Sequence, residues 1–129
     1  MEEKYKILII DDDSFILNLY VAKFQKGGQE VETARSCSEA FSKLKNGYVP
    51  NVVMIDVVLP DMNGLDFLSQ VRTEKLAPDA VYMMVTNQNS DDETSRAKEL
   101  GVAGYIIKAN STPSEVVAKV LELAKQHKK

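Results

Sequence analysis

Residues 51–60, Asn51-Val52-Val53-Met54-Ile55-Asp56-Val57-Val58-Leu59-Pro60, decide the fold. An aliphatic run without polar alternation is typical of a parallel strand that is covered on both faces. An ionised carboxylate is costly inside such a strand, so we expect Asp56 at its carboxyl end, where ligands bind in open α/β sheets. Pro60 then prevents the strand from continuing. Taken alone, an aspartate here more often begins a turn, so the other strand ends have to decide its role.

The chain has 129 residues and a formal net charge of −3. This length fits one domain with a continuous core, and we predict a single domain over residues 1–129 with a core from about residue 5 to residue 126. Direct contact with nucleic acid requires grouped Lys and Arg, which the sequence lacks. Because Cys37 is the only cysteine, no intrachain disulfide is possible, and we expect it to be a buried or half-buried small side chain.

The chain starts with charged residues, and no apolar run reaches the length needed to span a membrane. We therefore expect a soluble, cytoplasmic protein that does not contact membranes.

Five apolar stretches alternate with five stretches that carry apolar residues at helical spacing. The expected strands lie at residues 5–10, 30–34, 51–56, 80–85 and 102–107. The second of them alternates apolar and polar residues, which predicts a half-exposed edge strand. Strict alternation of strands and helices predicts a parallel sheet with helices on both faces, because parallel neighbours need crossover connections.

The helices have recognisable starts and faces. Ser36–Glu39, Ser90–Glu93 and Thr112–Glu115 each fit a capping box. In the first helix, residues 14–26, we expect the apolar face to consist of Phe15, Leu19 and Ala22, with Ile16, Tyr20 and Phe24 beside it.

Four of the five expected strands end in residues that can do chemistry, and these are Asp11-Asp12, Asp56, Thr86 and Lys108. Parallel strands place their carboxyl ends on one edge of the sheet, about 4.8 Å apart, so these side chains should meet. Three carboxylates together repel one another unless their pKa values rise or a divalent cation binds. An all-oxygen set of ligands favours Mg²⁺.

The ordered set of motifs resembles the receiver domain of two-component response regulators over essentially the whole chain. It comprises residues 9–12, Asp56 with residues 59–64, Thr86 after an apolar strand, and residues 104–108. The resemblance implies a three-layer, flavodoxin-like (βα)5 fold of class α/β, with a parallel five-stranded sheet in the order 2-1-3-4-5. That order places the first and third strands side by side.

The resemblance also implies a function in a phosphorelay. Asp56 would be the phosphoacceptor, and the donor would be a phosphohistidine of a histidine kinase or phosphotransfer protein. Asp12 and Asp56 would bind Mg²⁺ directly, Asp11 would bind it through water, and the backbone carbonyl of Val58 would complete the protein ligands. Phosphoryl transfer needs positioning and charge neutralisation more than covalent chemistry, which suits such a site.

The remaining roles follow from the same resemblance. Lys108 and the Thr86 hydroxyl would hold phosphoryl oxygens, and Tyr105 would be the switch aromatic. Output would be altered binding of a downstream protein to the fourth helix, the Tyr105 strand and the last helix. We expect a monomer or weak dimer that is not an enzyme beyond its own phosphorylation and dephosphorylation, and no DNA-binding output domain in this chain.

Two positions depart from the usual sequence of the family, and two further aspartates near the site are expected to have structural roles. The family usually follows the lysine with proline in a cis peptide, where this chain has Ala109, and a cis bond before alanine is costly. The family usually has a small residue after the threonine, where this chain has Asn87. We expect Asp13 to cap the first helix and Asp61 to be a turn residue.

Two other classes of protein remain open. A haloacid-dehalogenase-like phosphatase shares the chemistry and the Asp-x-Asp spacing, but Phe15 stands where that family has Thr or Val. A phosphorylation-independent binding module would keep the fold without needing the full acidic set. Flavin binding is disfavoured, since residues 11–13 would repel the flavin phosphate.

Overall fold

The computed structural model describes residues 4–87 and 90–127. Residues 1–3 and 128–129 of the predicted domain, and part of the polar loop predicted at residues 87–89, lie outside the described residues. The strands are β1 (Lys6–Ile10), β2 (Glu30–Ala34), β3 (Val52–Ile55), β4 (Val81–Thr86) and β5 (Gly104–Ile107). The helices are α1 (Ser14–Lys26), α2 (Cys37–Lys45), α3 (Gly64–Thr73), α4 (Asp91–Glu99) and α5 (Pro113–Gln126), with a 3-10 turn η1 (Lys108–Asn110) before α5.

The strands form one parallel sheet in the order β2-β1-β3-β4-β5, which confirms the predicted flavodoxin-like topology. The register pairs Ile10 of β1 with Ile55 of β3. Asp11 and Asp56, the first residues after β1 and β3, therefore leave the sheet side by side. The backbone N–H of Asp56 donates to the carbonyl of Ile10 at 3.1 Å and fixes this alignment.

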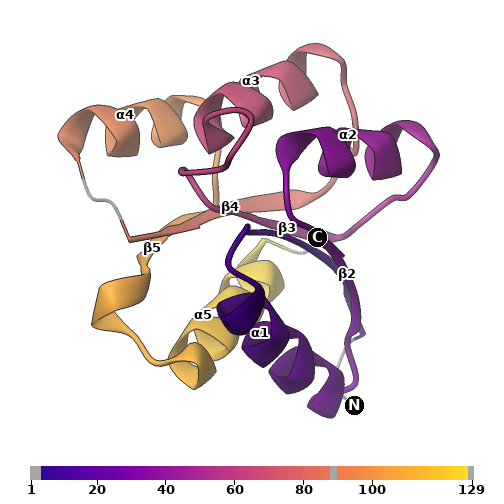
Figure 1. The fold of residues 1–129 in the computed structure, drawn as a ribbon, viewed down its shortest axis with the longest axis vertical. Helices are drawn as coiled ribbons and strands as arrows, with labels where there is room; N and C mark the ends of the chain where they lie inside the picture. Colours follow the sequence, from indigo (N-terminus) through magenta and orange to yellow (C-terminus); the bar gives the residue numbers. More distant parts are fainter. Residues whose placement is uncertain (1–3, 88–89, 128–129) are drawn as a thin grey trace.

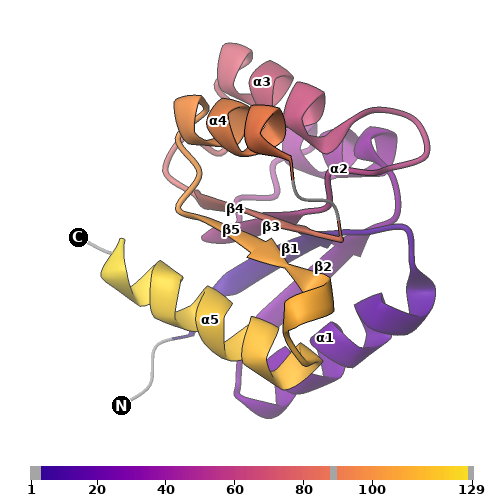
Figure 2. The same ribbon diagram turned by 90° about the vertical axis from the view of Figure 1, so that its left-hand side faces the viewer.

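The sheet is the middle of three layers (Figure 1). Helices α2, α3 and α4 cover one face, and α1 and α5 cover the other, as the turned view in Figure 2 also shows. Each face has its own core, and the side chains of the central strands alternate between the two cores. All four residues of β3 are buried, as expected for a strand covered on both faces. Within the described part of the chain, no helix is long and apolar enough to cross a membrane.

The predicted apolar face of α1 is turned away from the core, although two residues predicted beside that face, Tyr20 and Phe24, are buried. Phe15 is 67% exposed and Ala22 is also exposed, whereas Leu19 is only partly buried. Apolar residues occupy most of the circumference of this helix, so the sequence pattern leaves its rotation open, and packing on the sheet and on α5 decides it. The residues that α1 buries are Leu17, Tyr20 and Phe24.

The predicted serine and threonine caps are found at the starts of α2, α4 and α5. The Ser36 and Ser90 hydroxyls accept hydrogen bonds from the third residues of α2 and α4. Thr112 and Glu115 form a complete capping box at α5. In α2 the Glu39 carboxylate accepts from the backbone N–H of Arg35 at 2.7 Å, one residue before the position that a capping box requires.

Candidate functional site

A pocket of about 320 Å³ opens at the carboxyl ends of the strands. Parallel pairing brings the ends of β1, β3, β4 and β5 to this one edge, as the sequence predicts. The residues that line the pocket are Asp11, Asp12, Asp13, Asp56, Val58, Thr86, Asn87 and Lys108.

Three carboxylates form the acidic part of the pocket. Asp11, Asp12 and Asp56 each offer an oxygen within 4.8 Å of the others. Asp11 and Asp56 are only 3% and 8% exposed, whereas Asp12 is exposed to solvent. Burial raises the pKa of Asp11, although the hydrogen bond from Lys108 works in the opposite direction. This all-oxygen set has the ligand chemistry that Mg²⁺ requires, so Asp11, Asp12 and Asp56 could hold that ion.

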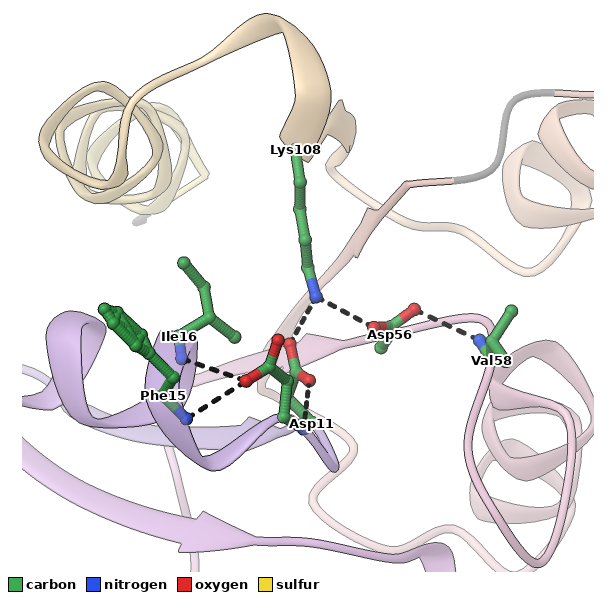
Figure 3. Close-up of polar contacts among 7 residues, drawn as sticks. Asp11, Phe15, Ile16, Asp56, Val58 and Lys108 are labelled. Carbon is green, nitrogen blue, oxygen red and sulfur yellow. Dashed lines mark hydrogen bonds and ion pairs between the residues drawn. The ribbon is translucent and has the colours of Figure 1, made fainter.

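Lys108 reaches into the pocket from the end of β5 and contacts two of the three carboxylates (Figure 3). Its Nζ donates to Oδ2 of Asp56 at 2.8 Å and also to Oδ2 of Asp11. Burial acts to lower the pKa of Lys108, but the hydrogen bonds to Asp11 and Asp56 outweigh it, so the pKa is raised. The ammonium therefore serves as the internal counter-ion of the carboxylates. The peptide bond between Lys108 and Ala109 is trans, in contrast to the family's usual cis bond.

The β3–α3 loop, residues 57–63, forms one wall of the site. The backbone N–H of Val58 donates to Oδ1 of Asp56 at 3.1 Å, while the Val58 side chain is 52% exposed. The N–H of Gly64 donates to the Val57 carbonyl at 2.7 Å and closes the loop. A Cβ on Gly64 would overlap the backbone carbonyl of Asp56, so only glycine allows this close approach.

Thr86 and Tyr105 lie at different depths. Thr86 is fully buried at the end of β4, and it lines the pocket. Tyr105 is partly buried on β5, where it packs against the core under α2, α3 and α4. Burial raises the pKa of Tyr105, with smaller contributions from Glu93 and Asp56. Of the seven predicted site residues, the structure brings six together in the pocket, and Tyr105 lies outside its lining.

Two further aspartates near the site have structural contacts. Asp13 caps α1, as predicted, because its carboxylate accepts from the N–H groups of Phe15 and Ile16 at 3.0 and 3.3 Å. Asp61, predicted to be only a turn residue, also accepts from the first two N–H groups of α2, those of Cys37 and Ser38. Sequence reasoning missed this contact, because the partners are more than twenty residues apart and no local pattern joins them.

Comparisons with known proteins agree with this geometry. The family model for the response regulator receiver domain matches residues 7–121. The response regulator SaeR of Staphylococcus aureus is 30% identical over 123 residues, covering 95% of this chain and 52% of that protein. The chain thus spans about half the length of the curated relatives that it matches.

Solved structures match over nearly the whole chain. A CheY-like receiver domain protein from Methanospirillum hungatei is 29% identical, with a TM-score of 0.85 and 97% of each chain covered. The chemotaxis response regulator CheY4 of Vibrio cholerae is 26% identical, with a TM-score of 0.82, covering 94% of this chain and 99% of that one. Fold, pocket and family model agree, and the chain belongs to the response regulator receiver domain family.

Proposed function

We propose that this receiver domain accepts a phosphoryl group on Asp56 from a phosphohistidine of a histidine kinase or phosphotransfer protein. The observation that carries the proposal is the position of Asp56, a nearly buried carboxylate at the wall of an open pocket, within 4.8 Å of two further carboxylates and in contact with Lys108. The acceptor is thus accessible from solvent, and the groups that can neutralise an incoming phosphoryl group surround it.

In the proposed reaction, a carboxylate oxygen of Asp56 attacks phosphorus, the bond between phosphorus and the donor nitrogen breaks, and an acyl phosphate forms. Both oxygens of Asp56 are oriented, Oδ1 by the N–H of Val58 and Oδ2 by Nζ of Lys108. Such orientation reduces the entropy lost on reaching an in-line geometry.

Asp11, Asp12, Asp56 and the backbone carbonyl of Val58 are the proposed ligands of Mg²⁺. When bound, the ion would neutralise charge on the carboxylates and on the phosphoryl oxygens. We expect Lys108 to exchange a carboxylate contact for a phosphoryl oxygen, and the Thr86 hydroxyl to contact a second oxygen.

The proposed output is a change in partner affinity at the surface formed by α4, β5 and α5. Thr86 is the last residue of β4, which precedes α4 in the chain, and Lys108 begins η1 between β5 and α5. Both proposed phosphate-sensing residues therefore adjoin this surface. Tyr105 on β5 is the proposed switch aromatic. A bound group shifts the equilibrium between two conformations of a surface only if it contacts the two conformations differently. Thr86, Lys108 and Tyr105 could supply such contacts.

Location, oligomeric state and catalysis complete the proposal. We expect the domain to act in the cytoplasm as a monomer or weak dimer, with catalysis limited to its own phosphorylation and dephosphorylation. In the phosphatase alternative Asp13 would be the acid–base residue, whereas here its Oδ1 caps α1.

The test is intact-protein mass with and without acetyl phosphate and Mg²⁺, on wild type and on Asp56→Asn. We expect one phosphoryl group on wild type only, because the amide keeps the shape of the side chain but loses the attacking anionic oxygen. Chelator should prevent the reaction, and Asp12→Ala should abolish it while Asp56 is intact. A phosphorylated Asp56→Asn protein would refute the assignment of the acceptor, and an unmodified wild type would favour a phosphorylation-independent binding module.

A further inference from the structure

The β3–α3 loop is attached to the start of α2. Oδ1 of Asp61 accepts from the N–H of Cys37 at 3.0 Å, and Oδ2 accepts from the N–H of Ser38 at 2.9 Å. Next to it, the Cys37 thiol donates to the carbonyl of Met62 at 3.7 Å. Three contacts thus join two consecutive loop residues to the first turn of one helix.

Local residues already cap α2 without this contribution. The Ser36 hydroxyl accepts from the N–H of Glu39 at 3.1 Å, and the Glu39 carboxylate accepts from the N–H of Arg35 at 2.7 Å. The N–H groups that Asp61 takes belong to the first turn of a helix, where water can serve as acceptor. The Asp61 carboxylate is itself exposed, so its contacts constrain the loop more than they stabilise the core.

The loop is therefore held at both ends. At its far end the N–H of Gly64 donates to the Val57 carbonyl, and at its near end the N–H of Val58 donates to Asp56. Asp61 and Met62 lie between these two attachments. With the middle of the loop also attached to α2, we expect the backbone of Val58 to move little relative to Asp56.

We infer that Asp61 is a positioning residue for the phosphoryl pocket, because it holds the β3–α3 loop, and with it the backbone of Val58, at a fixed place beside Asp56 for Mg²⁺ binding. This inference rests on the proposed function, which makes Val58 and Asp56 ligands of the ion. Groups that orient metal ligands without touching the metal typically change metal affinity by about 10–100-fold when removed.

The experiment compares Asp61→Ala with Ser36→Ala. Asp61→Ala removes two hydrogen bonds from the first turn of α2 and Ser36→Ala removes one, but only Asp61→Ala removes hydrogen bonds that attach the loop to the helix. The first measurement is amide hydrogen exchange in the metal-free protein. We expect faster exchange at Val58 in Asp61→Ala, and unchanged exchange at Val58 in Ser36→Ala.

The second measurement is Mg²⁺ affinity, followed by NMR shifts of the pocket amides. We expect Asp61→Ala to bind Mg²⁺ about tenfold more weakly than wild type, and Ser36→Ala to bind it normally. Asp61→Asn keeps only one acceptor oxygen and can preserve one of the two bonds, so it should fall between Asp61→Ala and wild type. Asp61→Asn also provides the comparison if the alanine variant does not fold.

Equal effects of the Asp61 and Ser36 variants on Val58 exchange and on Mg²⁺ affinity would overturn the inference, since Asp61 would then be a helix cap alone. That outcome leaves phosphorylation of wild type at Asp56 untouched. Conversely, a wild type that is not phosphorylated would refute the proposed function, whatever the Asp61 variants do to the loop.

Discussion

Lys108 contacts carboxylates that follow strands two and three positions away in the sheet, Asp56 after β3 and Asp11 after β1. The side chains of all three residues are at most 11% exposed. The attraction between the ammonium and the two carboxylates offsets the cost of removing these charges from water. Removing one partner would therefore leave a buried charge without a counter-ion. On the proposed function, Mg²⁺ would compete with the ammonium for the oxygens of Asp11 and Asp56, so we expect Lys108 to lower the affinity of the site for the ion.

We predict that Lys108→Met destabilises the metal-free protein and increases its affinity for Mg²⁺. Without the ammonium, Asp11 and Asp56 lack their counter-ion, and the free energy of unfolding in chelator should fall by up to about 3 kcal/mol. Added Mg²⁺ should narrow the gap from wild type, because the ion replaces the missing positive charge. The measurements are denaturant unfolding with and without Mg²⁺ and a Mg²⁺ titration.

The matched control is Lys119→Met, which removes an exposed lysine from α5 and should change neither stability nor affinity appreciably. A deficit for Lys108→Met that is the same in Mg²⁺ and in chelator would contradict the role of Lys108 as a counter-ion that the metal replaces.

At the scale of elements, the order and type of the helices and strands could be predicted, while rotations and long-range contacts could not. Period-two and continuous apolar runs located the strands, and serine and threonine caps located the helix starts. The rotation of α1 was mispredicted, because its apolar residues surround most of the helix and Phe15 looks like a core residue in sequence. β5 begins at Gly104, two residues later than expected, because the N–H of Val102 closes the end of α4.

The carboxylate cluster could be predicted because it depends on strand ends, which topology brings together. Lys108 was expected in this cluster for the same reason, and its bond to Asp56 agrees. The contact of Asp61 with α2 depends instead on the reach and rotamer of one side chain across the fold, about which sequence spacing carries no information. The resemblance to receiver domains supplied the strand order, which patterning alone left open.

The close approach of the start of α3 to the end of β3 also restricts which residue can occupy position 64. Gly64 starts α3, and a Cβ there would overlap the carbonyl of Asp56 and lie 2.9 Å from Cγ2 of Ile55. We predict that Gly64→Ala lowers the free energy of unfolding by about 3 kcal/mol, because a backbone atom must move to make room. Its displacement should also disturb the NMR shifts of Asp56 and Val58.

Gly104→Ala is the matched control for Gly64→Ala. Its Cβ would meet the end of the Leu123 side chain, which can change rotamer, so the cost should be about 1 kcal/mol or less. Thermal or denaturant unfolding of the two variants checks the difference. Equal losses would show that close approach to the backbone of Asp56 is not what requires glycine at position 64.

At the scale of the whole molecule, the central sheet separates two cores and gathers the chemistry at one edge (Figures 1 and 2). Among the described residues, the buried charged side chains Asp11 and Asp56 lie at that edge, whereas the core under α2, α3 and α4 contains the ionisable ring of Tyr82. The Tyr82 hydroxyl donates to the carbonyls of Leu76 and Ala77, both at 3.1 Å. The Tyr48 hydroxyl is also buried, and no hydrogen-bond partner for it is found among the described residues.

The last prediction concerns the response of the fold to alkaline pH. Burial raises the pKa of both Tyr82 and Tyr48 from 10.0 to about 12. Because the folded state favours the neutral phenol, each tyrosine contributes its full stabilisation below pH 10, and that contribution is lost as pH rises from 10 toward 12. The loss should be about 2–3 kcal/mol for each ring. The measurement is denaturant unfolding at several values of pH between 7 and 12.

Phenylalanine variants of the two tyrosines should separate this effect from hydrogen bonding. Tyr82→Phe loses its bonds to Leu76 and Ala77 and should be about 1 kcal/mol less stable at pH 7, whereas Tyr48→Phe removes an unpaired buried hydroxyl and should be as stable as wild type or more so. Both variants should lose less stability than wild type between pH 10 and 12. If the Tyr82→Phe profile ran parallel to that of wild type over this range, ionisation of the buried phenol could not be the cause of alkaline unfolding.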